Sequence, residues 1–241
     1  QAYYNGRTLG KIHLSFDADG KLSVSTSLDE LSKRKAELTD DSEVKAIIDK
    51  YSKDLEPVLN EKVFDLGIDL PHDTTENGGL SVMGVWSTAL MAKAGGTQIA
   101  VTNGGGLRRG FDKGEITVGL MYELLPFDNT IVTLKLKGSD LKRVIEHGIL
   151  AADFRPGQFY GLKVYFDPDK EAGNRINGMT LLDGTPIKMD EYYTVATNDF
   201  IYGAGDMYDF TGAIEVKDTG IPIRDKLVEM TKDNTGGIFN I

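Results

Sequence analysis

Residues 98–110 read QIAVTNGGGLRRG, a short apolar run followed at once by three glycines and two arginines. The run over 98–102 predicts a strand. Consecutive glycines expose bare backbone N–H groups and permit positive φ, and the guanidinium of Arg108 can hold a phosphate or carboxylate through two hydrogen bonds. The stretch lacks the glycine spacing of a Walker A loop or a dinucleotide-binding turn. It predicts either an anion-binding loop or a loop that only needs a flexible backbone.

Outward from this stretch, the spacing of apolar residues predicts interleaved helices and strands. A helix over 80–94 precedes it and ends at the Gly95-Gly96 pair. The other predicted elements are a hairpin over 11–27, helices over 42–59, 139–148 and 223–232, and strands over 131–137, 162–167, 179–182 and 192–197. This alternation predicts an α/β or α+β fold.

Length and composition limit the classes of function. The 241 residues suit one large domain or two small ones. The formal net charge of −10 argues against binding of a nucleic-acid polymer, and the absence of cysteine excludes disulfides, thiol nucleophiles and cysteine-bound metals. No apolar run is long enough for a transmembrane segment. Because the chain begins at Gln1, without an initiator methionine, we expect it to be part of a longer protein.

Two further segments place a phenylalanine in a turn beside polar side chains. They are LPFDN at 125–129 and TNDFIYGAGD at 197–206. A single phenylalanine in a loop is more often buried in the core than used as a stacking surface, because burial of an aromatic ring is strongly favourable. Asp206 by itself is typical of a turn or a cap. The residues alone leave both interpretations of these segments open.

Catalytic patterns are missing from the sequence. The three histidines, His13, His72 and His147, are never spaced to place two metal ligands on one helix face. The chain contains no Gly-x-Ser-x-Gly motif and no obvious pair of acid and base carboxylates. A phosphatase or metal hydrolase complete in this chain is therefore disfavoured, and the sequence predicts a binding site without catalytic residues.

Together, the segments at 103–108, 125–129, 167–175 and 197–206 resemble the C-terminal domain of the 5'-nucleotidase / UDP-sugar hydrolase / 2',3'-cyclic-nucleotide phosphodiesterase family. They occur in the family's order within residues 75–235. The resemblance implies a layered α/β/β/α fold with mixed sheets over 66–241. It also implies that 1–35 are the closing strands of a missing metallophosphoesterase domain and that 36–65 form the interdomain linker helix.

The resemblance further implies a set of substrate-binding residues. Phe127 and Phe200 would sandwich the base, and Asn129 would hydrogen-bond the base edge. Asp206 would accept hydrogen bonds from the ribose hydroxyls. The phosphate or ribose side would be lined by the remaining two residues of the set, Asn103 and Arg108.

In function, the resemblance implies the substrate-specificity domain of a secreted, metal-dependent phosphoesterase that hydrolyses nucleoside phosphates. This chain would bind a small nucleotide or nucleoside and no cofactor, and by itself would be inactive. A two-metal site is expected in the N-terminal domain, its partner. The expected location is extracellular, periplasmic or cell-wall associated. The alternative is a non-catalytic nucleoside-binding or surface interaction module, because Met207 replaces a usual glycine and residues 75–79 lack a usual arginine. Asp128 replaces another usual glycine and adds a negative charge beside the proposed base pocket.

Overall fold

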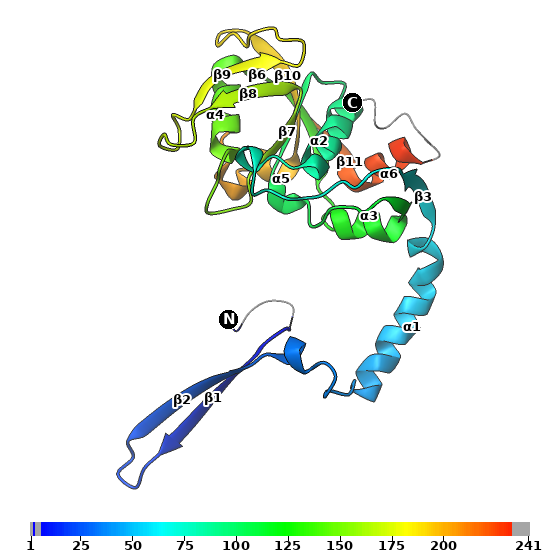
Figure 1. Cartoon of the computed structure of the whole chain (residues 1–241), viewed down its shortest axis with the longest axis vertical. Coiled ribbons are helices and arrows are strands. Elements are labelled where there is room, and N and C mark those ends of the chain that lie inside the picture. Colours follow the sequence, from blue (N-terminus) through cyan, green and yellow to red (C-terminus); the bar gives the residue numbers. More distant parts are fainter. Residues whose placement is uncertain (1, 3–5, 233–241) are drawn as a thin grey trace. The chain divides into compact units, whose positions relative to one another are not determined.

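The computed structural model describes residue 2 and residues 6–232, which belong to two compact units divided between Leu55 and Glu56. The first unit contains the hairpin of β1 (Leu9–Phe16) and β2 (Leu22–Asp29), the short 3-10 helix η1 (Leu31–Arg34) and most of α1 (Ser42–Leu59) (Figure 1). The two strands are antiparallel and pair without a bulge. The predicted hairpin and the predicted helix over 42–59 are both confirmed.

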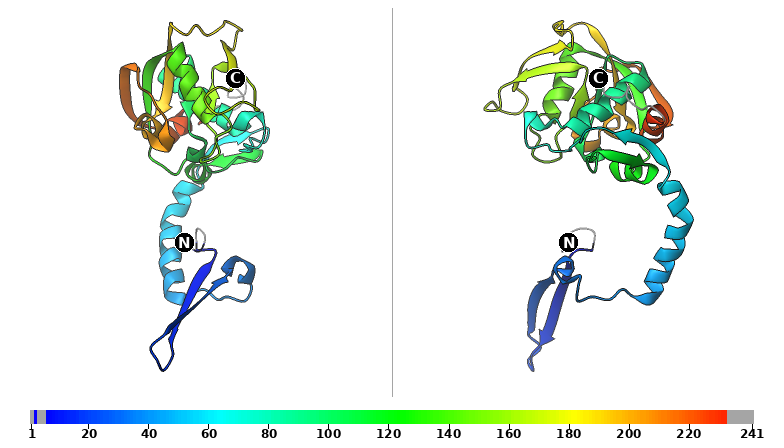
Figure 2. Two further views of the ribbon diagram at one scale, coloured as in Figure 1. Left: turned by 90° about the vertical axis from the view of Figure 1, so that its left-hand side faces the viewer. Right: turned by 45° about the vertical axis from the view of Figure 1, so that its right-hand side comes forward.

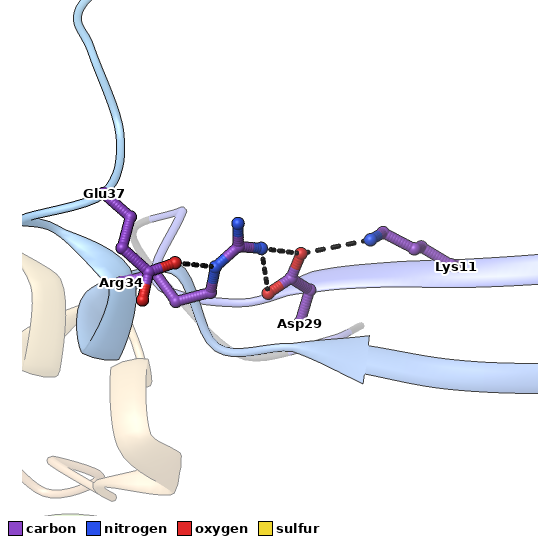
Figure 3. Close-up of polar contacts among 4 residues, drawn as sticks. All are labelled: Lys11, Asp29, Arg34 and Glu37. Atoms are coloured by element: carbon purple, nitrogen blue, oxygen red, sulfur yellow. Dashed lines mark hydrogen bonds and ion pairs between the residues drawn. The ribbon is translucent and has the colours of Figure 1, made fainter.

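A polar cluster joins the end of β2 to η1 (Figure 3). Asp29 accepts from Lys11 Nζ at 3.0 Å and from Arg34 Nη1 at 2.8 Å, and Arg34 Nε also donates to Glu37 at 2.9 Å. Both contacts lower the pKa of Asp29. The hydrogen bond from Lys11 has the largest effect, and the hydrogen bond from Arg34 has the next largest. Ion pairs this close to solvent stabilise a fold little, so the cluster fixes local geometry more than it stabilises the unit.

Apolar side chains of the first unit are open to solvent. Every residue of β1 is exposed, including Ile12 at 72% and Phe16 at 68%, and α1 has no buried residue although its sequence is amphipathic. Large apolar surfaces of this kind are rare on monomeric proteins and mark places where another surface binds. No described residue of this unit covers the apolar side chains of β1.

The second unit is built around a mixed five-stranded sheet of order β11-β6-β10-β4-β7 (Figure 2). The central strand β10 is parallel to β4 and antiparallel to β6. The outer strands β7 and β11 pair antiparallel with β4 and β6. The bounds are β4 (Ile99–Thr102), β6 (Thr130–Lys137), β7 (Gln158–Tyr160), β10 (Tyr192–Asn198) and β11 (Ile214–Pro222).

Two hydrophobic clusters cover the two faces of this sheet. Ala100 belongs to one cluster, whereas its neighbours Ile99 and Val101 belong to the other, as expected for side chains that alternate along a strand. The first cluster is completed by α2 (Val82–Gly95), α3 (Val118–Leu124), α6 (Ile223–Thr231) and the pair β3 (Lys62–Leu66) and β5 (Gly114–Thr117). The second is completed by α4 (Gly138–Gly148) and the pair β8 (Leu162–Phe166) and β9 (Ile176–Leu181). The layered α/β prediction with mixed sheets is confirmed.

The helix before the glycine-rich stretch is more deeply buried than its sequence indicates. The spacing predicts one apolar stripe, but Ser87, Thr88 and Ala92 are buried as well. The reason is that α2 packs against β4 and β7 and also against α6. Its start is fixed by Ser81, whose hydroxyl accepts from Gly84 N at 3.0 Å, and its end by Gly96 at φ 62°.

Candidate functional site

Three neighbouring strands bring distant segments to one edge of the five-stranded sheet. The parallel strands β4 and β10 end there at Thr102 and Asn198, and the antiparallel β6 begins there, with Ile131 opposite Asn198. Ligands of α/β folds usually bind beyond the carboxyl ends of parallel strands. The glycine-rich stretch follows β4, and the LPFDN segment precedes β6. The segment at 197–206 begins with the last two residues of β10 and continues beyond it.

A cavity of about 300 Å³ lies where these segments meet. This volume is at the small end of the range for small-molecule sites. Every residue of the predicted set lines it, so the structure brings together side chains from positions up to a hundred residues apart. The lining residues are Asn103, Gly105, Gly106, Arg108, Phe127, Asn129, Phe200 and Asp206.

The two phenylalanines of the cavity are half open to solvent. Phe127 is 51% exposed and Phe200 46%, which rules out the alternative that these rings are buried in the core. The Phe200 ring lies against Gly205, where a Cβ atom would come within 2.5 Å of it. Gly205 therefore permits the backbone to approach the ring. Both rings offer aromatic surface to the cavity.

A chain of hydrogen bonds orients Asn103 and Asp206. Nδ2 of Asn198 donates to Thr102 Oγ1 at 2.8 Å and to Asn103 Oδ1 at 3.1 Å, and Nδ2 of Asn103 then donates to Asp206 Oδ2 at 2.8 Å. Asn198 is itself fixed, because its Oδ1 caps α5 (Asp199–Tyr202) by accepting from Ile201 N. Among the described residues, no side chain donates to Asp206 Oδ1. That oxygen is available to accept from a ligand.

Asn129 is oriented by a carboxylate outside the cavity lining. Its Nδ2 donates to Asp199 Oδ1 at 2.7 Å, and Thr130 N donates to the same oxygen at 3.2 Å. A carboxylate accepts and does not donate when ionised, so this contact determines which end of the amide faces Asp199. The Oδ1 atom of Asn129 is left as a hydrogen-bond acceptor, without a partner among the described residues.

The two adjacent arginines have different surroundings. Arg109 forms an ion pair with Glu123 and does not line the cavity. Arg108 lines the cavity, donates from Nη1 to Gly105 O at 3.0 Å, and lies 6.0 Å from the centre of the Phe127 ring. Its guanidinium has no carboxylate partner in the described part of the chain. Arg108 is therefore the arginine able to bind an anion in the cavity.

In the glycine-rich stretch, Gly104 is needed because of limited space. Gly104–Gly106 form the short 3-10 helix η3, and none of the three uses the positive φ that glycine permits. A Cβ on Gly104 would lie 2.2 Å from the carbonyl oxygen of Pro156. The backbone of the loop is thus packed directly against residues 155–156.

His72 contacts the backbone of the glycine-rich loop. Its Nε2 lies 3.2 Å from Gly104 O and its Nδ1 lies 2.7 Å from Ser81 Oγ. Because a carbonyl oxygen only accepts, Nε2 donates to Gly104 O, and a neutral ring then accepts at Nδ1 from the Ser81 hydroxyl, whose single proton has Gln158 Oε1 at 3.0 Å as its other acceptor. Burial lowers the pKa of His72, which also favours the neutral form. His72 connects the first turn of α2 to the cavity wall.

With this geometry established, the family can be assigned. Residues 61–213 match the family model for the 5'-nucleotidase, C-terminal domain. The chain belongs to that family. The matched range includes every residue that lines the cavity, so the cavity lies within the 5'-nucleotidase C-terminal domain.

Individual relatives agree with the family. The chain is 31% identical over 233 residues to the trifunctional nucleotide phosphoesterase protein YfkN of Bacillus subtilis, covering 91% of this chain and 16% of that protein. It is 26% identical to the cell wall protein Lmo0130 of Listeria monocytogenes, covering 86% and 29%. A 5'-nucleotidase precursor from Thermus thermophilus has a similar structure, with a TM-score of 0.73, 28% identity and coverage of 94% and 48%. The chain thus spans half or less of these relatives.

The structure accommodates Asp128, the residue at which the resemblance implies a glycine. Its carboxylate accepts from Arg224 Nη2 at 2.7 Å and does not line the cavity. Arg224 is buried, donates from Nη1 to Leu125 O at 3.0 Å, and lies 3.8 Å from the centre of the Tyr122 ring. The added negative charge is therefore neutralised on the far side of the turn. Arg224 comes from α6, and no motif in the sequence indicates its role.

The segment after Gly203 carries backbone strain. Ala204, Asp206 and Met207 all have positive φ, at 69°, 50° and 60°. Left-handed backbone costs a residue other than glycine about 1–2 kcal/mol. Met207 thus adopts a conformation that a glycine would adopt freely. The segment is held from behind by His147, whose Nε2 lies 2.8 Å from Asp206 O.

Metal-binding side chains do not gather among the described residues of this domain. In residue 2 and residues 6–232, no group of three or more histidine, cysteine, aspartate or glutamate side chains is placed to hold a metal ion. The donor set that a hydrolytic metal needs is therefore not present in the described chain. Separately, no helix in the described part of the chain is long and apolar enough to cross a membrane.

Proposed function

We propose that this domain holds the nucleoside part of a substrate for a metal-dependent nucleotide phosphoesterase. The observation that carries the proposal is the cavity itself. Three separate segments place two half-exposed phenylalanine rings, two oriented amides, a carboxylate and an arginine around one space of about 300 Å³. Aromatic surface together with a few fixed polar groups is suited to a nucleoside.

Each group has a defined part in this proposal. Phe127 and Phe200 stack on the base, which contributes about 1–3 kcal/mol per stacked base. The free Oδ1 of Asn129 accepts from an N–H on the base edge, and the free Oδ1 of Asp206 accepts from a ribose hydroxyl. Arg108 donates to a phosphate oxygen. Fixing the nucleoside in this way holds the phosphate ester in one position for reaction.

Hydrolysis itself is assigned to a domain outside this chain. The described residues offer no metal-binding group, so the chain contributes binding and orientation, while the metal ions would supply the activated water elsewhere. We expect no release of phosphate from AMP by this chain with added Mn²⁺ or Zn²⁺. Turnover that follows the chain through purification, and that is lost on Phe127→Ala, would contradict this assignment.

The open apolar surface of the first unit supports a missing N-terminal partner domain. The exposed strands β1 and β2 would be the closing strands of a metallophosphoesterase domain over 1–35, and α1 would belong to a linker over 36–65. The relative named as a cell wall protein supports a location outside the cytoplasm, in the cell wall, the periplasm or the medium. A full-length protein would be expected to bury the apolar residues of β1.

A non-catalytic nucleoside-binding or surface interaction module is the second candidate. It is favoured by two departures from the pattern that the resemblance implies: residues 75–79 contain no arginine, and Met207 follows Asp206 where a glycine is expected. The residues upstream of Gln1 distinguish the two candidates. An intact set of metal ligands there supports the enzyme, and a degenerate set supports the module.

Calorimetric titration with adenosine and with AMP tests the proposed function. Phe127→Ala and Phe200→Ala should each weaken binding by about tenfold or more, because each removes one stacking surface. The control is Phe16→Ala, which removes an exposed phenylalanine, 68% open to solvent, from the hairpin. Absence of binding to the folded wild-type chain up to millimolar ligand, or equal losses in all three variants, would contradict the proposal.

A further inference from the structure

A second and larger cavity lies in the same unit. It has a volume of about 650 Å³ and shares no lining residue with the first cavity. One wall is the exposed side of α4, another is the segment 149–154 that follows it, and a third is the turn at 172–175 between β8 and β9. Met207 closes the fourth side. No residue of this cavity has a part in the proposed nucleoside site.

A buried carboxylate organises the cavity. Glu146 is 5% exposed, and its two oxygens accept from the backbone N–H groups of Arg175 and Ile176, each at 2.7 Å. The guanidinium of Arg175 in turn donates from Nε to Lys170 O and from Nη1 to Ile149 O, at 3.2 and 3.0 Å. Both acceptors are neutral carbonyls. Arg175 is therefore held in place by three hydrogen bonds that it donates, one from its backbone N–H and two from its guanidinium. No carboxylate among the described residues forms an ion pair with the guanidinium.

A second cation of the cavity also lacks a partner. Lys142 lies one turn before Glu146 on α4, is half-buried, and has no hydrogen bond or ion pair with any described residue. Its neighbour Arg143 differs, because Asp140 and Asp209 neutralise it. The other acid of the lining, Asp153, is exposed and pairs with none of these cations. Two cations without an ion-pair partner among the described residues thus line one cavity.

Apolar side chains supply the rest of the surface. Phe154 stacks on His147, with ring centres 4.9 Å apart, and is itself only half-buried. Leu150 is half-buried, and Met207 is 67% exposed. Methionine and aromatic side chains adapt well to organic ligands. The cavity combines these two cations with an uncovered apolar surface.

We propose that this cavity binds a small organic anion. The anionic group, a carboxylate or a phosphate, lies between Lys142 and Arg175, and the apolar body of the ligand lies on Leu150, Phe154 and Met207. Guanidinium and ammonium groups bind both kinds of oxyanion strongly when a cavity partly excludes water. This ligand would be separate from the nucleoside, because the two cavities share no lining residue. They are neighbours, since Asp206 lines the first cavity and Met207 lines the second.

Nuclear magnetic resonance titration of the ¹⁵N-labelled chain tests this site. The probes are benzoate and phenyl phosphate, which distinguish the two anionic groups, and benzyl alcohol as the neutral match. We expect saturable shifts for at least one anion, confined to amides of 139–154, 172–176 and 207. Benzyl alcohol should bind about tenfold more weakly or not at all, because it lacks the charge that the cations attract.

Lys142→Glu is the decisive variant, because the Lys142 side chain has no contact whose loss would unfold α4. It should weaken binding of the anion by about tenfold or more. The matched control is Lys217→Glu, an exposed lysine of β11 outside both cavities, which should change the affinity less than twofold. Phe127→Ala should leave this binding intact, which separates it from the nucleoside site.

Three outcomes would overturn the proposal. The first is shifts that stay linear up to about 20 mM of either anion, which would correspond to no specific affinity. The second is equal binding by the wild-type chain and the Lys142→Glu variant. The third is shifts centred on the first cavity that disappear in the Phe127→Ala variant.

Discussion

The two units of the chain contain similar strand residues in opposite environments. Leu14 of β1 is 56% exposed, whereas Leu136 of β6 is fully buried. Both belong to strands with alternating apolar residues, but only β6 has helices and a second layer of strands packed on its sheet. The alternation of apolar residues therefore predicts a strand, but it does not show whether this chain contains the residues that cover the strand.

The same substitution in the two units should have very different effects. Leu136→Ala leaves a cavity in the core and should lower the free energy of unfolding by about 2–5 kcal/mol. Leu14→Ala removes an exposed side chain and should change it by less than about 0.5 kcal/mol. Urea unfolding followed by fluorescence of Trp86, the single tryptophan, reports on the second unit. A comparable loss for Leu14→Ala would show that the hairpin stabilises the sheet.

A smaller loss of stability is expected at the contact between the glycine-rich loop and residues 155–156. Gly104→Ala would place a Cβ atom 2.2 Å from Pro156 O, so the backbone must shift, at a cost of about 1–3 kcal/mol. Gly67→Ala is the control, because a Cβ there has no heavy atom within 4 Å. Thermal unfolding of both variants measures the difference. Equal stability would mean that residues 155–156 yield without cost.

Loss of a single hydrogen bond should reduce nucleoside affinity moderately. Purine riboside, which lacks the amino group of adenosine, should bind the wild-type chain about tenfold more weakly, because Asn129 Oδ1 loses its donor. The two ligands should bind the Asn129→Ala variant equally. Phe16→Ala in the hairpin should leave the preference unchanged. Equal affinities for the wild-type chain, measured by calorimetry, would remove Asn129 from base recognition while leaving stacking in place.

The smallest predicted effect is a pH dependence carried by His72. Burial lowers the pKa of His72 in the folded chain below its ordinary value of 6.5, so the unfolded chain binds a proton first as the pH falls. The contribution of His72 to the free energy of unfolding should be constant above pH 6.5. It should decrease as the pH falls from 6.5 through the lowered pKa of the folded chain. His72→Gln should reduce this decrease. Urea midpoints between pH 7.5 and 5 test it, and identical pH slopes in both proteins would contradict it.

Much of the fold could be predicted because its central elements carry local patterns. The hairpin, the three central strands and the helices over 42–59 and 139–148 appear within a residue or two of their predicted bounds, apart from longer hairpin strands. The short strands β3, β5 and β7 and the short helix α3 could not be predicted. The strands pair with segments far away in the sequence. All four elements are only three to seven residues long, which is too short for the apolar spacing to identify a strand or a helix. β11 was missed because it is mostly exposed and interrupted by irregular pairing.

The site shows the same division. The residues that line the first cavity belong to recognisable segments, so the resemblance could point to them. Asn198 could have been identified as a helix cap, since asparagine is favoured there. The roles of Asp199 and Arg224 depend on contacts with residues 70 and 96 positions away, which no local pattern contains. The sequence showed that glycines at 104–106 would permit positive φ, but it could not show that Gly104 is required by close packing against Pro156, which is 52 positions away.

The central position of β10 also governs the order in which the domain can be completed during synthesis. β4 and β6 leave the ribosome early, but they do not pair with each other, and residues 192–198 must arrive before one sheet forms. Until then the nascent chain presents unpaired edges of two apolar strands, the kind of surface that aggregates or recruits chaperones. A chain that ends before residue 192 would therefore be unable to assemble either the sheet or the cavity, whatever the length of its N-terminal part.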